Sequence, residues 1–181
     1  EKYIRVTADE KADIYIINTC SVTDAADCKC RQVIRKFIHR SPEAYIVVAG
    51  CYAQLKPAEI SSIEGVDLVL GSNEKFDLAK WIEDAEKHGK AVVHSGNLEE
   101  DDPFHPSWSA GDRTRSFLKV QDGCDYFCSF CTIPLARGAS RSATIAETVE
   151  VAREVAKTGV KEVVLTGVNI GDFGIQQGEN F

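Results

Sequence analysis

The first hundred residues alternate short apolar runs with amphipathic stretches. Three of the runs have the uninterrupted apolar character that is typical of strands buried in a parallel sheet: 13–18, 45–50 and 66–70. A fourth run, 3–6, predicts a strand nearer the edge. Helical stretches are predicted at 24–40, 58–63 and 76–88. This alternation predicts an α/β domain with an open parallel sheet and helices on both of its faces.

Residues 96–113 interrupt the alternation. They contain two glycines, two prolines and the acidic run 99–102. Such a composition is typical of a linker between domains. We therefore expect a first domain over 1–95, a linker over 96–113 and a second domain over 114–181.

The second domain begins as another parallel α/β unit. A strand is predicted at 117–121, a helix at 145–158 and a strand at 162–166. Thr144 and Glu147 form a capping-box pattern at the start of the helix, and Gly159 follows its end. The remaining length accommodates about two strands, whereas a closed (β/α) barrel contains about eight. We expect only the beginning of a barrel.

Composition and charge narrow the functional classes. The chain is 44% hydrophobic and 27% charged, as in ordinary globular proteins. No apolar run approaches the roughly 20 residues of a membrane span, and no signal peptide opens the chain. We therefore expect a cytoplasmic protein without a membrane partner.

The net charge of −7 does not suggest nucleic-acid binding, but residues 113–141 carry five Lys or Arg against two Asp. The absence of methionine indicates a piece of a longer protein.

Three of the seven cysteines form the clearest chemical motif. Cys124, Cys128 and Cys131 lie within eight residues on the loop that follows a predicted buried strand. Three thiolates can hold one soft metal centre, and iron–sulfur clusters require thiolates. A closed structural zinc site generally has four protein ligands, whereas a three-cysteine 4Fe-4S cluster leaves one iron free for a small molecule. The alternatives are a zinc site completed by a distant histidine, or three cysteines packed in the core.

The spacing C-x3-C-x2-C after a first β-strand resembles the signature of the radical S-adenosylmethionine (SAM) superfamily. The resemblance implies a 4Fe-4S cluster on Cys124, Cys128 and Cys131 whose open iron binds SAM. It also implies an electron donor protein, because an electron from the cluster splits SAM into methionine and a 5′-deoxyadenosyl radical.

Phe130, the aromatic residue before the third cysteine, would lie near the SAM adenine, with plain packing as the alternative.

Further motifs extend the resemblance over nearly the whole chain. They are 18–23, 49–51, 133–138 and 165–172, in the order seen in the radical SAM methylthiotransferases. The resemblance implies a flavodoxin-like N-terminal domain that lacks its first element here, followed by the start of a partial (β/α) radical SAM barrel. It implies a SAM-dependent transferase, of which this piece is expected to be inactive alone.

Two more cysteines follow predicted parallel strands. Cys20 and Cys51 fall just past the carboxyl ends of these strands, where open α/β sheets bind ligands. Core packing would explain two isolated cysteines as well, but the resemblance implies that both bind a second 4Fe-4S cluster, with the third ligand upstream of residue 1.

Cys28 and Cys30 lie two residues apart on a predicted helix and point to opposite sides. Neither is predicted to be a ligand, because Cys30 lies on the apolar stripe and Cys28 points to water.

Four further residues are candidates for cofactor contacts. Arg137 and Arg141 match the family's Arg-Gly-x-Ser-Arg stretch, which implies a role in binding SAM or substrate. Gly167 and Asn169 belong to the motif at the end of the last predicted strand, where the resemblance places cofactor binding.

The resemblance also implies a substrate. Family members transfer a methylthio group to an unactivated C–H carbon. Residues 167–174 look most like the branch that converts N6-threonylcarbamoyladenosine next to the tRNA anticodon to its 2-methylthio derivative, so the anticodon loop of tRNA is the expected partner. The alternatives are isopentenyladenosine in tRNA or a ribosomal protein. From another class, the alternative is a non-catalytic metal-binding module that interacts with RNA.

Overall fold

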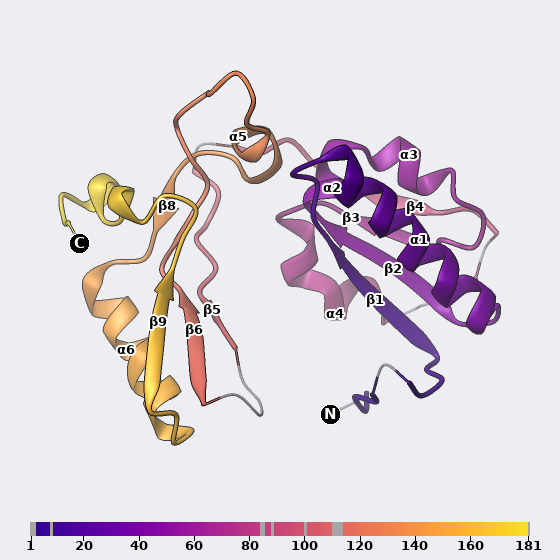
Figure 1. The fold of residues 1–181 in the computed structure, drawn as a ribbon, viewed down its shortest axis with the longest axis horizontal. Coiled ribbons are helices and arrows are strands. Elements are labelled where there is room, and N and C mark those ends of the chain that lie inside the picture. Colours follow the sequence, from indigo (N-terminus) through magenta and orange to yellow (C-terminus); the bar gives the residue numbers. More distant parts are fainter. Residues whose placement is uncertain are drawn as a thin grey trace. The chain divides into compact units, whose positions relative to one another are not determined.

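The computed structural model describes residues 3–7, 9–83, 86–87, 89–99, 101–109 and 114–180 (Figure 1). The chain forms two compact units, Glu1–Asn97 and Leu98–Phe181. The predicted end of a helix at 88, the linker residues 100 and 110–113, and Arg113 at the start of the positive stretch lie outside the described residues. None of the described helices is long and apolar enough to cross a bilayer.

The first unit is built on a four-stranded parallel sheet in the order β1-β2-β3-β4. The strands are β1 (Ile14–Thr19), β2 (Tyr45–Gly50), β3 (Leu68–Leu70) and β4 (Val92–His94). The predicted parallel sheet is therefore confirmed. The sequence pattern did not reveal β4, because its apolar run is short and two of its three side chains are exposed. The predicted edge strand at 3–6 is wrong. Ile4 is 92% exposed, so this run buries too little apolar surface to pair with the sheet.

The helices of this unit are α1 (Asp24–Arg40), α2 (Cys51–Leu55), α3 (Pro57–Ser61), the 3-10 turn η1 (Glu74–Asp77) and α4 (Leu78–Trp81). Thr23 caps α1 by accepting a hydrogen bond from the N–H of Ala26. The predicted helix at 58–63 is wrong in its bounds: helix begins at Cys51 and is broken before Pro57, whose ring disfavours helical geometry at Lys56. The predicted long helix from 76 is only one 3-10 turn and one α-helical turn in the described residues.

Helices cover both faces of the sheet, as predicted. On one face, Ile46 and Val48 of β2 pack with Ile34 of α1 and Ile60 of α3. On the other face, the alternate β2 residues pack with Leu78 and Trp81 of α4. This alternation along β2 follows from the two-residue period of a strand, and it buries β2 almost completely.

The second unit contains a three-stranded sheet in the order β5-β6-β9. Its strands are β5 (Ser107–Trp108), β6 (Arg115–Lys119) and β9 (Glu162–Thr166), with β6 and β9 parallel and β5 antiparallel to β6. Helix α6 (Ile145–Lys157) connects the parallel pair and begins with the predicted Thr144–Glu147 capping box. Leu118, Val120 and Phe173 form the core under α6. The βαβ unit expected at the start of a barrel is therefore present (Figure 1).

Short elements fill the loops at the carboxyl ends of β6 and β9. They are β7 (Gln121–Asp122), α5 (Ile133–Arg137), β8 (Arg141–Ser142), η2 (Ile170–Asp172) and η3 (Ile175–Gln177). Strands β7 and β8 pair antiparallel, and the cysteine loop lies between β7 and α5. This arrangement fixes both ends of the loop.

Candidate metal centre

The cysteine loop begins at a glycine that no other residue can replace without strain. Gly123 has φ +74°, and a Cβ added there would lie 1.8 Å from the carbonyl oxygen of Ala139. The next N–H, of Cys124, donates to the carbonyl oxygen of Gly138 at 3.1 Å. The start of the loop therefore lies directly against the backbone that leads into β8.

The three loop cysteines are free thiols on an open surface. Cys128 is exposed, and Cys124 and Cys131 are partly buried. The backbone N–H of Cys131 donates to the carbonyl oxygen of Cys128 at 2.9 Å, so the last two cysteines flank one turn. Phe130, between them, is 89% exposed. A large aromatic side chain with so little protein contact is available to a ligand or to another part of a larger protein.

The structure places these cysteines on one loop but does not gather their sulfur atoms. Among the described residues, no three His, Cys, Asp or Glu side chains lie close enough together to hold a metal ion. The donor set itself fits an iron–sulfur cluster, because all three residues are free cysteines and thiolates are the ligands that such clusters use. The loop is anchored at its ends and open at its middle, where the thiols would have to converge.

Cys20 and Cys51 lie at the carboxyl edge of the first unit's sheet. They follow Thr19 and Gly50, which are partners in the register of β1 and β2, so the two cysteines leave neighbouring strands at the same level. Gly50 has φ +101°, and a Cβ there would lie 2.6 Å from Oδ1 of Asn18. Only glycine fits, and it turns the chain so that Cys51 becomes the first residue of α2. Cys51 is buried, Cys20 is exposed, and both are free.

An ion pair between the buried Asp27 and the partly exposed Lys56, which the sequence pattern did not predict, links the segments that follow these two cysteines. Asp27 of α1 is 2% exposed; it accepts from Ser21 Oγ at 2.6 Å and from Lys56 Nζ at 2.7 Å. Ser21 follows Cys20, and Lys56 follows α2, which begins at Cys51. The signal was present in the sequence, because Asp27 falls on the apolar face of α1, and a buried carboxylate requires a partner.

The positions of the two cysteines on α1 agree with the sequence: Cys30 was expected on the apolar face and Cys28 toward water. Cys30 packs against the core of the first unit, and its Sγ lies 3.5 Å from the carbonyl oxygen of Cys20. Cys28 is exposed.

The two candidate arginines make contacts within the second unit. Arg137 Nη1 lies 3.0 Å from Oδ1 of Asp122. Arg141 is 7% exposed and donates from Nη1 to the carbonyl oxygens of Arg137 and Ala139, at 2.6 and 3.2 Å. In this structure both guanidinium groups hold the segment between α5 and β8. A direct contact of either with SAM or substrate stays a prediction.

Asp122 is the electrostatic centre of the loop's base. It is 6% exposed and accepts hydrogen bonds from Lys119 Nζ at 2.9 Å, Arg137 Nη1 at 3.0 Å and the N–H of Gly123 at 3.0 Å. Burial by itself raises the pKa of Asp122, but the charges and hydrogen bonds of Lys119 and Arg137 outweigh it and lower the pKa to about 2. The carboxylate therefore stays ionised throughout the physiological range.

Replacing Asp122 by asparagine is expected to lower stability at neutral pH and to flatten its acid dependence. The folded-state pKa of about 2 lies below the ordinary value of 3.8. The stabilisation is therefore complete above pH 4 and is lost as the pH falls through about 2; it amounts to roughly 2 kcal/mol. Urea unfolding of wild type and Asp122→Asn between pH 2 and 7 measures it. Glu150→Gln removes only an exposed ion pair with Arg153 and should cost under about 0.5 kcal/mol. Equal losses in the two variants would contradict the assignment.

Gly167 and Asn169 lie where β9 ends beside β7. The N–H of Asn169 donates to Oε1 of Gln121 at 2.8 Å, and its side-chain Nδ2 donates to Asp172 at 2.8 Å. A Cβ on Gly167 would lie 2.9 Å from the same Oε1 of Gln121. Gly167 and Asn169 therefore both lie against the buried side chain of Gln121, which also contacts Gly123 at the start of the cysteine loop. Gln121 was not identified by the sequence analysis.

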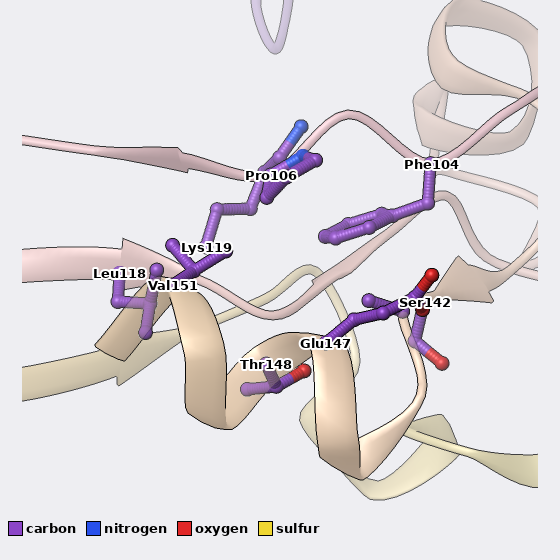
Figure 2. Close-up of a pocket in the computed structure, with 9 residues that line it drawn as sticks. Phe104, Pro106, Leu118, Lys119, Ser142, Glu147, Thr148 and Val151 are labelled. Carbon is purple, nitrogen blue, oxygen red and sulfur yellow. The ribbon is translucent and has the colours of Figure 1, made fainter. Parts of the chain in front are cut away.

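A cavity of about 360 Å³ lies beside this network in the second unit. Its walls come from the segment before β5, from β6 and β8, and from α6, and it contains none of the predicted site residues. Figure 2 shows the Phe104 ring reaching over the space above Glu147 and Thr148 of α6. Lys119 Nζ lies 5.2 Å from the centre of the Phe104 ring and also pairs with Asp122. The cavity is therefore connected to the base of the cysteine loop through one lysine.

Comparison with known proteins gives two family matches along the chain. Residues 1–71 match the uncharacterized protein family UPF0004, and residues 118–173 match the radical SAM superfamily. The second match includes the cysteine loop, Arg137, Arg141, Gly167 and Asn169.

Similar proteins carry methylthiotransferase names. A threonylcarbamoyladenosine tRNA methylthiotransferase MtaB of Bacillus subtilis is 40% identical over 95% of this chain and 39% of its own length. The protein of that name in Aquifex aeolicus is 39% identical over 98% of this chain and 44% of its own length. A tRNA-2-methylthio-N(6)-dimethylallyladenosine synthase of Syntrophotalea carbinolica is 32% identical over 97% of this chain and 41% of its own length. The chain thus spans about two fifths of the length of these curated relatives. With its UPF0004 segment followed by a radical SAM segment, the chain is similar over nearly its whole length to about two fifths of the length of these methylthiotransferases.

Proposed function

We propose that the protein containing this chain transfers a methylthio group to N6-threonylcarbamoyladenosine next to the tRNA anticodon. The observation that carries the proposal is the cysteine loop: three free thiols between β7 and α5, within the segment that matches the radical SAM superfamily. The substrate is supported by degree of likeness. Five relatives named as threonylcarbamoyladenosine enzymes are 33–40% identical, and two dimethylallyladenosine synthases are 28% and 32% identical.

The three loop cysteines would hold a 4Fe-4S cluster. When bound, the cluster supplies one open iron for SAM and the electron that cleaves it, which comes from an electron donor protein. Phe130 is exposed beside Cys131 and is free to lie against the adenine. Gly167 and Asn169 lie at the end of β9 next to the start of the cysteine loop, where they would contact SAM. Arg137 and Arg141 hold the backbone between the loop and β8 in place.

Cys20 and Cys51 would bind a second 4Fe-4S cluster together with a third ligand upstream of residue 1. Their support is geometric: both follow the carboxyl ends of adjacent parallel strands, the edge at which open α/β sheets bind ligands. In this division, residues 1–95 form the methylthiotransferase N-terminal domain and 114–181 the start of the radical SAM barrel. The segment between them, 96–113, would be more than a linker, because its residues Ser107–Trp108 form β5 and pair with β6 in the second unit. We place the protein in the cytoplasm, where tRNA is modified.

The RNA would present its target base outside a helix. Sequence-specific recognition of RNA usually involves unpaired loop bases, which can be splayed out and stacked on aromatic side chains. An adenosine of the anticodon loop meets this condition. Tyr126, Phe127 and Phe130 of the cysteine loop are all more than half exposed, so the loop offers aromatic surface beside the proposed cluster.

Deleting the parent gene is expected to leave N6-threonylcarbamoyladenosine in tRNA without its 2-methylthio group, which nucleoside mass spectrometry of total tRNA measures. Complementation with wild type should restore the modification, and Cys128→Ala should not. Cys28→Ala is the matched control and should restore it, because Cys28 is an exposed cysteine outside the loop. If 2-methylthio-isopentenyladenosine or a modified ribosomal protein disappears instead, the substrate is wrong. Full restoration by Cys128→Ala would remove the basis for the catalytic proposal, and zinc without iron in the purified protein would favour a non-catalytic RNA-binding module.

A further inference from the structure

Gln121 is a fully buried side chain at the junction of the cysteine loop and the end of β9. It is 0% exposed. Its Nε2 lies 2.8 Å from the carbonyl oxygen of Gly123, 3.0 Å from Ser140 Oγ and 3.1 Å from the carbonyl oxygen of Asp122. Its Oε1 accepts from the N–H of Asn169 at 2.8 Å. One side chain therefore contacts the residue before Cys124 and a residue of the loop after β9.

The orientation of this amide is determined by its partners. The N–H of Asn169 can only donate, so it must face the oxygen of the Gln121 amide. The carbonyl oxygens of Asp122 and Gly123 can only accept, so they must face the nitrogen. Rotating the amide by 180° would place acceptor against acceptor and donor against donor in a site without water access, which is costly. No other uncharged side chain of this length supplies both groups.

The surrounding backbone allows little compensation. Gly123 cannot move toward β8, because its Cα already approaches the carbonyl oxygen of Ala139 too closely for a Cβ. Gly167 likewise lies against Gln121, with a would-be Cβ 3.0 Å from Cβ of Gln121. The distance between the start of the cysteine loop and Asn169 is therefore set by the length of one glutamine side chain.

We infer that Gln121 is a positioning residue that holds the Asn169 segment at the correct distance from the cysteine loop, so that SAM can bind both at once. This inference rests on the proposed function, in which the loop carries the cluster and the β9 end contacts SAM. Gln121 itself touches neither group. Its loss should leave the three thiols able to bind iron, while the loop and the β9 end are no longer aligned for SAM.

The experiment compares the anaerobically reconstituted full-length protein with its Gln121→Met variant, which keeps the side-chain volume and removes both hydrogen-bonding groups. Iron content, the SAM dissociation constant by equilibrium dialysis, and the electron paramagnetic resonance spectrum of the reduced protein with and without SAM are measured. We expect iron content to be retained and SAM affinity to fall about tenfold, the effect of losing one or two buried hydrogen bonds. The spectral change on adding SAM should shrink accordingly.

Gln121→Glu is the second variant, and it applies also if Gln121→Met does not fold. It keeps the length and the oxygen that accepts from Asn169, but it turns an acceptor toward Gly123 and Asp122. It should weaken SAM binding with iron retained. A general structural role would instead lower iron content and SAM affinity together, and that result would overturn the inference, as would wild-type SAM affinity in either variant. A wild-type protein that binds no iron or no SAM would refute the proposed function itself.

Discussion

Replacing Cys124, Cys128 and Cys131 together by alanine is expected to remove about four of about eight irons from the reconstituted full-length protein and to abolish reductive cleavage of SAM. The physical reason is that an iron–sulfur cluster is held by its thiolates, and the described part of the second unit contains no other cysteine. Iron and sulfide analysis measures the first effect. Methionine and 5′-deoxyadenosine released under reducing conditions measure the second.

Cys28→Ala is the control for the loss of a thiol as such. Cys28 is free and exposed, and its Sγ accepts a hydrogen bond from Gln32 Nε2 at 3.9 Å. This variant should retain both iron and SAM cleavage. Reductive SAM cleavage by the triple alanine variant would show that the loop does not carry the reactive cluster.

Replacing Gly123 by alanine is expected to destabilise the second unit by roughly 3–5 kcal/mol, which is large for a single methyl group. The added Cβ would lie 1.8 Å from a backbone oxygen, and the residue would also have to keep φ +74°. The backbone at Ala139, between α5 and β8, cannot move away without breaking the hydrogen bond from the N–H of Cys124 to the carbonyl oxygen of Gly138. Urea unfolding measures the loss, and iron binding by the cysteine loop should fall with it.

Gly178→Ala separates the clash from the backbone strain. Gly178 has nearly the same φ, +71°, but a Cβ there meets nothing within 4 Å. This control should cost only the left-handed backbone conformation, about 1 kcal/mol. If both alanine variants lose the same stability, the close contact between Gly123 and Ala139 does not contribute as we describe.

Local patterns in the sequence predicted the elements that depend on local physics. The apolar runs located β1, β2 and β3, and the pair Thr144 and Glu147 located the start of α6. The apolar runs are short stretches with the length of a buried strand, and the capping box supplies hydrogen bonds to the first turn of its helix. The strand expected at 3–6 is absent and the helix expected over 76–88 is short in the described residues. Both depend on how much surface the rest of the fold can bury, which a short window of sequence does not contain.

The cysteine motif is local in the sequence, but the side chains that hold the surrounding segments in place come from distant positions. Three cysteines within eight residues identify the loop from the sequence alone. Gln121 lies 48 residues from Asn169, and Asp27 lies 29 residues from Lys56, so neither contact has a sequence spacing that would suggest it. Both are buried polar side chains next to glycines or cysteines of the motifs. A buried amide or carboxylate next to a predicted ligand loop is therefore a useful signal once a fold is known.

The measurement that tests the central claim most directly is electron–nuclear double resonance on the reduced full-length protein mixed with SAM labelled with ¹⁵N at its amino group. If Cys124, Cys128 and Cys131 hold a cluster with one open iron, the labelled nitrogen should show hyperfine coupling to the cluster spin. The coupling should disappear in the triple alanine variant. A wild-type spectrum without nitrogen coupling, in protein that contains iron and binds SAM, would contradict the assignment of this loop as the SAM-cleaving centre.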